Sequence, residues 1–170
     1  TIAFAMECYE EGIITPEMTG GLGLRFGNAE AMLQTLELIN KREGIGDLLA
    51  EGTMRAAGKL GEGAERFAVH VKGQELPMHE PRYKRGLGLG YAVSPTGADH
   101  CHNLHDPAVQ GEGWVKLRPF GIAEAVPMES LGGDKVRAFK YWMEMRVLAN
   151  CLSICHFPPW DFTDYIDLVQ

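Results

Sequence analysis

Residues 28–44 read NAEAMLQTLELINKREG and carry the clearest helical signal of the chain. Asn28 is a favourable N-cap residue. Lys41 and Arg42 place positive charge where a helix would end, just before Gly44. Between these ends, apolar side chains recur at helical spacing: Met32, Leu33, Leu36 and Ile39. The pattern predicts a helix over residues 29–42 with these four residues on its apolar face.

Helical signals continue on both sides of this segment. Further helices are predicted for residues 2–11, for a short segment after Thr15, and for residues 47–60, 86–93, 134–152 and 161–169. Residues 67–71 alternate like a short strand, and residues 94–132 are rich in loop formers with short helices. The glycines within residues 86–90 predict that their helix packs very closely against a neighbour. We therefore expect a mostly all-α, multihelical fold with two helical subdomains.

The segment ELPMHEPR at residues 75–82 marks the expected boundary between the subdomains. Its two prolines favour an extended crossing, so we divide the chain into residues 1–78 and 79–170. The chain opens at Thr1 directly inside a helical pattern and stops at Gln170 without a capping signal. We therefore expect it to be a piece of a longer protein.

Charge and composition exclude several classes of function. A formal net charge of −7 makes nucleic acids and anionic membrane surfaces poor partners. No run approaches the roughly 20 apolar residues that a membrane span requires. The cysteines are irregularly spaced and no leader sequence precedes them, which favours a reducing cytoplasm over a disulfide scaffold.

The densest group of chemically active side chains lies within residues 99–106. Its members are Asp99, His100, Cys101, His102, His105 and Asp106. Imidazoles titrate near neutrality and suit general acid/base work, whereas histidine and cysteine together can also bind zinc. Structural zinc sites usually show two separated ligand pairs, and no clear second pair appears here. An acid/base site, a zinc site and a solvated histidine-rich loop therefore all stay open.

The other candidate motifs carry weaker signals. Cys151 and Cys155 stand where the helix over 134–152 ends, but an iron–sulfur cluster generally needs four such ligands. By themselves these two predict buried structural cysteines, as does Cys8. The glycine runs at residues 20–27 and 86–90 match neither G-x-G-x-x-G after a strand nor a G-K-[ST] ending. Classical nucleotide binding is therefore not expected.

Six segments, taken in order, resemble the aldehyde:ferredoxin oxidoreductase family. They read IAFAME at residues 2–7, TGGL at 19–22, FGNAE at 26–30, GDLLAEG at 46–52, VKGQELP at 71–77 and GLGYA at 88–92. The resemblance extends over nearly the whole chain. It implies that residues 1–78 are part of the helical second domain and residues 79–170 the first part of the helical third domain. The N-terminal pterin-binding base domain would be absent from this chain.

The resemblance implies an oxidoreductase that converts aldehydes to carboxylic acids and passes electrons to ferredoxin. Members of the family use a tungsten or molybdenum ion between two pterins, a tungstopterin or molybdopterin cofactor, next to a [4Fe–4S] cluster. The chain by itself is expected to be inactive and to bind neither cofactor, because three of the cluster cysteines lie upstream in the family. A homo-oligomer is possible for the longer protein.

The family's functional residues carry over to five positions. The segment NCLSIC at residues 150–155 is similar to the family's D-x-x-G-L-C, so Cys155 matches a cluster ligand, and Asn150 and Ile154 match pterin-binding residues. Asn150 and Ser153 stand where the family has Asp and Gly. In TGADH at residues 96–100, His100 matches the histidine beside the metal and is expected to manage a proton. His79 matches a position where some relatives place a tyrosine near the substrate.

Three alternatives remain beside this interpretation. The substitutions at Asn150 and His79 are compatible with an aromatic acyl-CoA reductase of the same broad family. A non-catalytic helical module that has lost its cofactor is the second alternative. A small zinc protein using His100, His102 and the cysteines is the third.

Overall fold

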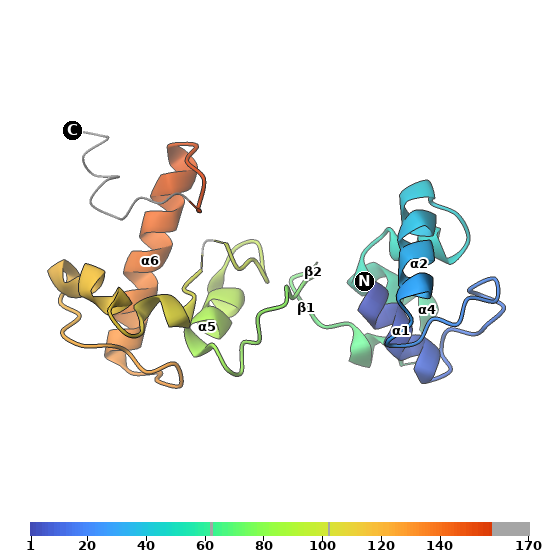
Figure 1. Cartoon of the computed structure of the whole chain (residues 1–170), viewed down its shortest axis with the longest axis horizontal. Coiled ribbons are helices and arrows are strands. Elements are labelled where there is room, and N and C mark those ends of the chain that lie inside the picture. Colours follow the sequence, from blue (N-terminus) through green and yellow to red (C-terminus); the bar gives the residue numbers. More distant parts are fainter. Residues whose placement is uncertain (62, 102, 158–170) are drawn as a thin grey trace. The chain divides into compact units, whose positions relative to one another are not determined.

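The computed structural model describes residues 1–61, 63–101 and 103–157 (Figure 1). The mostly helical fold class is confirmed, since these residues form six α-helices, three short 3-10 helices and two short strands. The chain divides into two compact units, Thr1–Leu76 and Pro77–Gln170.

The first unit is a small helical cluster closed by a hairpin. Its elements are α1 (Ile2–Glu10), α2 (Ala29–Lys41), α3 (Ile45–Leu49), α4 (Thr53–Leu60), η1 (Ala64–Phe67), β1 (His70–Val71) and β2 (Gln74–Glu75). The two strands pair antiparallel, with His70 opposite Glu75. Apolar side chains of α1 lie at the centre of the core with Ile14, Leu24 and Leu49. Cys8 is buried among them, in agreement with a structural role.

Helix α2 forms where predicted but buries a different face. The Asn28 side chain caps it by accepting a hydrogen bond from the Ala31 N–H at 3.1 Å. Three of the four residues of the predicted apolar face are exposed in this chain: Met32, Leu33 and Leu36 are 43%, 53% and 54% exposed. The buried residues are the small Ala31 and Thr35.

A glycine allows α3 to approach the backbone of α2 near the C-terminal end of that helix. A Cβ at Gly46 would lie 2.2 Å from the Leu38 carbonyl carbon, which no side chain tolerates. Of the four residues of the predicted apolar face, Ile39 packs against the core.

Three local predictions differ from the structure in this unit. The helix expected over residues 47–60 is broken at Gly52, whose φ of 87° stops α3 and starts α4. The short helix expected after Thr15 is a series of turns that ends at Gly21. The strand expected over 67–71 is confined to His70–Val71, because Phe67 belongs to η1. The helix predicted for residues 161–169 lies outside the described residues.

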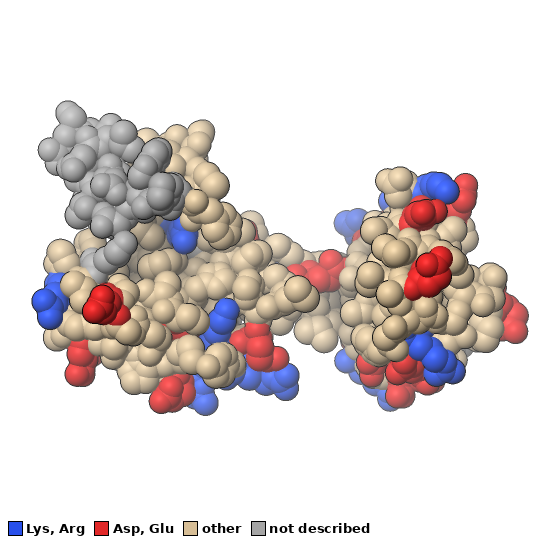
Figure 2. Space-filling view, in the orientation of Figure 1, with Lys and Arg blue, Asp and Glu red and all other residues tan. Residues whose placement is uncertain are grey.

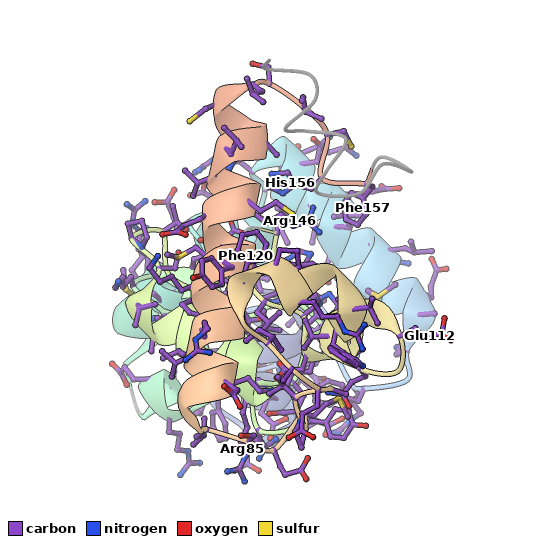
Figure 3. All side chains as sticks on the ribbon, turned by 90° about the vertical axis from the view of Figure 1, so that its left-hand side faces the viewer. Arg85, Glu112, Phe120, Arg146, His156 and Phe157 are labelled. Atoms are coloured by element: carbon purple, nitrogen blue, oxygen red, sulfur yellow. The ribbon has the colours of Figure 1, made fainter. Side chains whose placement is uncertain are left out.

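The second unit is built around two helices joined by a loop-rich segment. Its elements are α5 (Arg85–Val93), η2 (Asp106–Val109), η3 (Gly113–Phe120) and α6 (Gly133–Cys151). Residues of η2, η3 and α6 form its core with Leu104, Ile122 and Val126. Phe120 stacks on Tyr141 of α6 with ring centroids 4.4 Å apart (Figure 3).

The glycines of α5 admit a very close neighbour, as predicted. A Cβ at Gly90 would lie 2.4 Å from the Asn103 side chain, and one at Gly86 would lie 2.9 Å from Asp106. The neighbour is therefore the segment around residues 103–106. That segment also carries the candidate histidines.

The surface of the described residues carries both acidic and basic side chains, as the composition indicates. Acidic and basic side chains are interspersed over the face of each unit shown in Figure 2. Among the described residues, no helix combines the length and the apolar character that crossing a membrane requires.

Candidate active site

His79 is held by a turn that brings a lysine back to its ring. The backbone N–H groups of Tyr83 and Lys84 donate to the Glu80 carbonyl at 3.3 and 3.0 Å. This turn places Lys84 Nζ 3.2 Å from His79 Nδ1. On the other side, the Tyr91 hydroxyl of α5 donates to the His79 carbonyl at 3.3 Å.

Three imidazoles meet in the second unit. The ring centroid of His79 lies 4.8 Å from that of His100 and 4.7 Å from that of His105. His100 and His105 are 5.8 Å apart. The structure thus brings His79 and His100 together, although 20 residues separate them in sequence, and adds His105 to the group.

His105 also supports the main chain of His100. Its Nε2 lies 2.9 Å from the His100 carbonyl oxygen, which can only accept a hydrogen bond. His105 is therefore the donor in this contact. The preceding part of the loop is held by Asn103, whose amide donates to the Asp99 carbonyl.

Burial and neighbouring charge favour the neutral forms of His79, His105 and Tyr91. Burial, followed by Lys84 and His100, lowers the pKa of His79 below 6.5. Burial also lowers the pKa of His105, and this outweighs the hydrogen bond to the His100 carbonyl. Burial, Asp99 and Glu80 raise the pKa of Tyr91 to about 12. Neutral imidazoles at pH 7 are able to accept protons.

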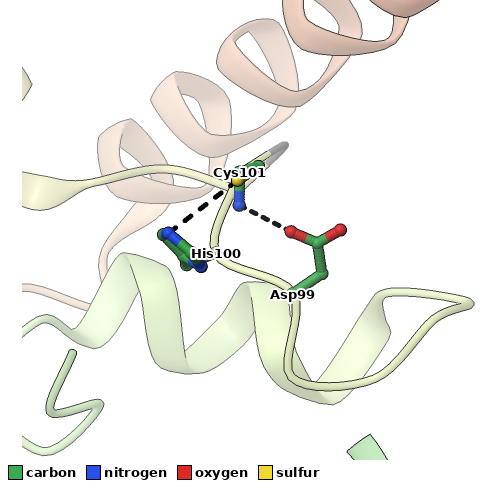
Figure 4. A group of neighbouring side chains, drawn as sticks. All are labelled: Asp99, His100 and Cys101. Carbon is green, nitrogen blue, oxygen red and sulfur yellow. Dashed lines mark hydrogen bonds between the residues drawn. The ribbon is translucent and has the colours of Figure 1, made fainter. Parts of the chain in front are cut away.

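The triplet Asp99, His100 and Cys101 is the one group of at least three potential metal ligands within the described residues (Figure 4). His100 Nε2 lies 3.8 Å from Cys101 Sγ, while Asp99 Oδ1 accepts the Cys101 N–H at 2.6 Å. Burial and Asp99 raise the pKa of the Cys101 thiol. The described residues add no fourth ligand, and His102 lies outside them. The described residues therefore offer three potential ligands, and the zinc alternative stays a prediction.

The C-terminal end of α6 carries the second set of predicted residues. Cys155 is exposed, and its Sγ accepts the backbone N–H of Phe157 at 3.4 Å. Asn150 is exposed and Ile154 is half-buried. Cys151 is exposed as well, so the prediction that it is a buried structural cysteine was wrong. It lies in the last turn of α6, on a face that the described residues leave uncovered.

His156 joins this end of α6 to the histidine loop. Its Nδ1 lies 3.1 Å from the Cys101 carbonyl, and the Arg146 guanidinium donates to the His156 carbonyl (Figure 3). The residues matched to cluster and pterin binding and those matched to proton transfer are thus linked within one unit through the Cys101–His156 contact.

The donor set at this end fits one corner of an iron–sulfur cluster. Cys155 offers an accessible sulfur that already accepts a backbone N–H, the kind of contact that tunes cluster potentials. No other cysteine joins Cys155 in a potential metal-binding group among the described residues. If Cys155 binds a cluster, the other cysteine ligands would therefore lie outside the described residues.

Sequence reasoning missed Lys84 and Tyr91, and it did not assign Asp106 a partner. Lys84 has no motif of its own, and only the turn at Glu80 brings it to His79. The Asp106 carboxylate is buried at the N-terminus of α5, where it accepts the N–H groups of Gly86 and Leu87 at 3.0 and 3.1 Å. It also pairs with the buried Lys135 of α6.

Comparison with known proteins identifies similar sequences over the whole chain. All of residues 1–170 match the family described as aldehyde ferredoxin oxidoreductase, domains 2 & 3. The tungsten-containing aldehyde ferredoxin oxidoreductase of Pyrococcus horikoshii is 35% identical over 176 residues, and that of Pyrococcus furiosus is 34% identical over 174. Each match covers 100% of this chain and 27% of the relative.

A relative with a different name matches a shorter part. The aliphatic sulfonate oxidoreductase, WOR-like subunit, of Pyrococcus furiosus is 41% identical over 113 residues, which is 63% of this chain and 18% of that protein. The full-length match to the domain 2 and 3 family and the identity to its tungsten-containing members agree with the helical fold. The chain belongs to the aldehyde ferredoxin oxidoreductase family.

Proposed function

We propose that this chain forms part of the active site of an oxidoreductase that converts aldehydes to carboxylic acids and passes the electrons to ferredoxin. The observation that carries the proposal is the proximity of His79 and His100, whose ring centroids are 4.8 Å apart. Both residues were matched to substrate-side positions of the family from sequence alone. Because the chain spans 27% of the length of its relatives, the remaining parts of the site would come from outside it.

The cofactors of this proposal are a tungsten (or molybdenum) bis-pterin and a [4Fe–4S] cluster. When bound, they would supply the two-electron oxidation and the path by which electrons leave singly. Cys155 would provide one thiolate ligand to the cluster. Asn150 and Ile154 would contact a pterin, with an amide at Asn150 where the family has a carboxylate.

The chain's own residues would handle the substrate oxygen and a proton. Oxidation of an aldehyde to an acid consumes water and releases two electrons and two protons. His100 would take up one of these protons, while His79 would bind the substrate oxygen by a hydrogen bond. The lowered pKa of His79 keeps that ring neutral near pH 7.

Ferredoxin as the electron acceptor and a cytoplasmic location are parts of the same proposal. All four cysteines, Cys8, Cys101, Cys151 and Cys155, are free thiols. Free thiols support a reducing compartment, in which a low-potential carrier such as ferredoxin would operate.

Metal analysis and a His100→Asn variant of the full-length protein, produced anaerobically, test the proposal. We expect tungsten or molybdenum together with about four irons per chain. We expect the variant to lose roughly 10²–10⁴-fold in aldehyde turnover with unchanged metal content, the usual range for a lost acid/base group. His70→Asn, in the hairpin of the first unit, is the matched control and should keep normal turnover. Near-normal turnover of His100→Asn would remove His100 from the mechanism.

Aliphatic sulfonates are a second candidate substrate class. The higher identity, 41%, to the aliphatic sulfonate oxidoreductase subunit favours testing them. Reduction of the metal centre by an aliphatic sulfonate, but not by simple aldehydes, would replace the aldehyde assignment.

A further inference from the structure

We propose that Lys84 is a positioning residue that holds His79 as the neutral tautomer with its proton on Nε2. In this form His79 presents a fixed hydrogen-bond donor to the carbonyl oxygen of the substrate. The inference rests on the proposed function for the identity of that substrate, but its geometry is a property of this chain.

The first step of the argument is the direction of the hydrogen bond between Lys84 and His79. Lys84 Nζ lies 3.2 Å from His79 Nδ1. An ammonium group has three N–H donors and no lone pair, so Nδ1 must be the acceptor. The proton of a neutral His79 ring is then on Nε2.

The second step excludes the charged form of the ring. A doubly protonated His79 would place an N–H on Nδ1 facing the Lys84 ammonium, with two like charges about 3 Å apart. Burial lowers the pKa of His79 most, and the charge of Lys84 lowers it further. Lys84 therefore selects the tautomer of the ring and, together with burial, disfavours its charged form.

The third step is that the ring is also held in orientation. His105 packs edge-on against it with an interplanar angle of 89°, and His100 packs at 44° on a centroid distance of 4.8 Å. His105 is fixed in turn by its hydrogen bond to the His100 carbonyl. The Tyr91 hydroxyl holds the His79 carbonyl, so both ring and main chain are constrained.

The consequence is a division of roles between the imidazoles. A carbonyl oxygen only accepts hydrogen bonds, so a ring that binds it must offer an N–H. His79 would offer that N–H permanently, without any change in charge. His100 is then left to carry a proton. A hydrogen-bond donor that is already in place stabilises developing charge on the substrate oxygen most effectively, because it does not have to reorient during the reaction.

Nitrogen NMR of the whole 170-residue chain, labelled with ¹⁵N in histidine, tests the assignment without any cofactor or turnover. At pH 8 we expect His79 to show the Nε2–H tautomer alone. Lys84→Met should give exchange-averaged tautomers, with the Nδ1 and Nε2 resonances of His79 shifted toward each other. Lys84→Arg keeps the donors and should keep the single tautomer.

The matched control is Lys140→Met, which removes an exposed lysine paired with Glu144 in the same unit. It should leave the His79 resonances unchanged. An Nδ1–H or charged His79 in the wild-type chain would overturn the proposal, as would unchanged His79 resonances in Lys84→Met. If Lys84→Met fails to fold, the wild-type spectrum and Lys84→Arg still decide the tautomer. Failure of aldehyde turnover in the full-length protein would refute the proposed function and leave this result standing.

Discussion

Ser153 ends α6 in the left-handed conformation, with φ at 57°. The Ser153 N–H donates to the Asn150 carbonyl at 3.0 Å, and the Ile154 N–H donates to that of Ala149 at 2.9 Å. These are the two hydrogen bonds of a Schellman motif, where glycine is the usual residue at the left-handed position. The geometry explains why glycine is favoured at this place in D-x-x-G-L-C, and it makes the serine a strained substitute. The strained residue stands two positions before Cys155.

Ser153→Gly should stabilise the second unit by up to about 1 kcal/mol, because glycine adopts the left-handed conformation without steric cost. Urea denaturation followed by tryptophan fluorescence reports on this unit, since Trp114 and Trp142 belong to it and the first unit has no tryptophan. Ser153→Ala is the control and should bring no gain. Equal stabilities of the serine and glycine forms would show that the strain is relieved elsewhere.

At the scale of elements, α5 depends on a cap supplied from far along the chain. Its own N-cap residue, Lys84, makes no side-chain cap hydrogen bond. The buried Asp106 carboxylate satisfies the N–H groups of Gly86 and Leu87 instead, and it neutralises the buried Lys135 of α6. One carboxylate thus joins α5, η2 and α6, and it holds the segment that carries the histidines.

Asp106→Leu should destabilise the second unit by about 3–5 kcal/mol, since it leaves the Lys135 ammonium buried without its partner. Adding Lys135→Met should recover part of this loss, while the missing cap of α5 should keep the double variant below wild type. Tryptophan-monitored urea denaturation of both single variants and the double variant measures the coupling. Strictly additive losses would mean that the two side chains do not interact energetically.

At the scale of the whole chain, the two units should differ in their response to acid. In the second unit the pKa values of His79 and His105 are lowered from 6.5. In the first unit, burial raises the pKa of Glu75, but hydrogen bonds from Thr1 and Thr53 outweigh it and lower the pKa to about 2. Glu75 thereby caps α4 by accepting the Thr53 N–H at 2.7 Å.

The signs of these shifts define two separate pH windows. Below pH 6.5, His79 and His105 bind more protons in the unfolded state than in the folded state. The free energy of unfolding of the second unit should therefore decrease as the pH falls through that value. The stabilising effect of Glu75 is present above pH 4.5 and is lost as the pH falls toward about 2. Tryptophan fluorescence and amide exchange in α1 should follow the two units separately. A double His79→Gln, His105→Gln variant should reduce the pH dependence of the second unit's stability near pH 6.5. Glu75→Gln should reduce the pH dependence of the first unit's stability below pH 4.5. Simultaneous loss of both units near pH 6 would contradict this separation.

The sequence by itself determined the local features of the protein and its family. Asn28 predicted the start of α2, and the glycines of residues 86–90 predicted close packing of α5, because caps and glycine effects depend on a few neighbouring residues. The ordered motifs pointed to the family and singled out His79 and His100. The roles of these residues and of Cys155, Asn150 and Ile154 stay predictions.

Only the tertiary structure decided which surfaces and charges meet. Periodicity indicated that α2 has an apolar stripe, yet the tertiary structure buries Ala31 and Thr35 and leaves Met32, Leu33 and Leu36 exposed. Lys84 reaches His79 through a turn, and Asp106 reaches Lys135 across 29 residues. Local patterns cannot encode such pairs, because their partners are set by how the helices pack and not by spacing along the chain.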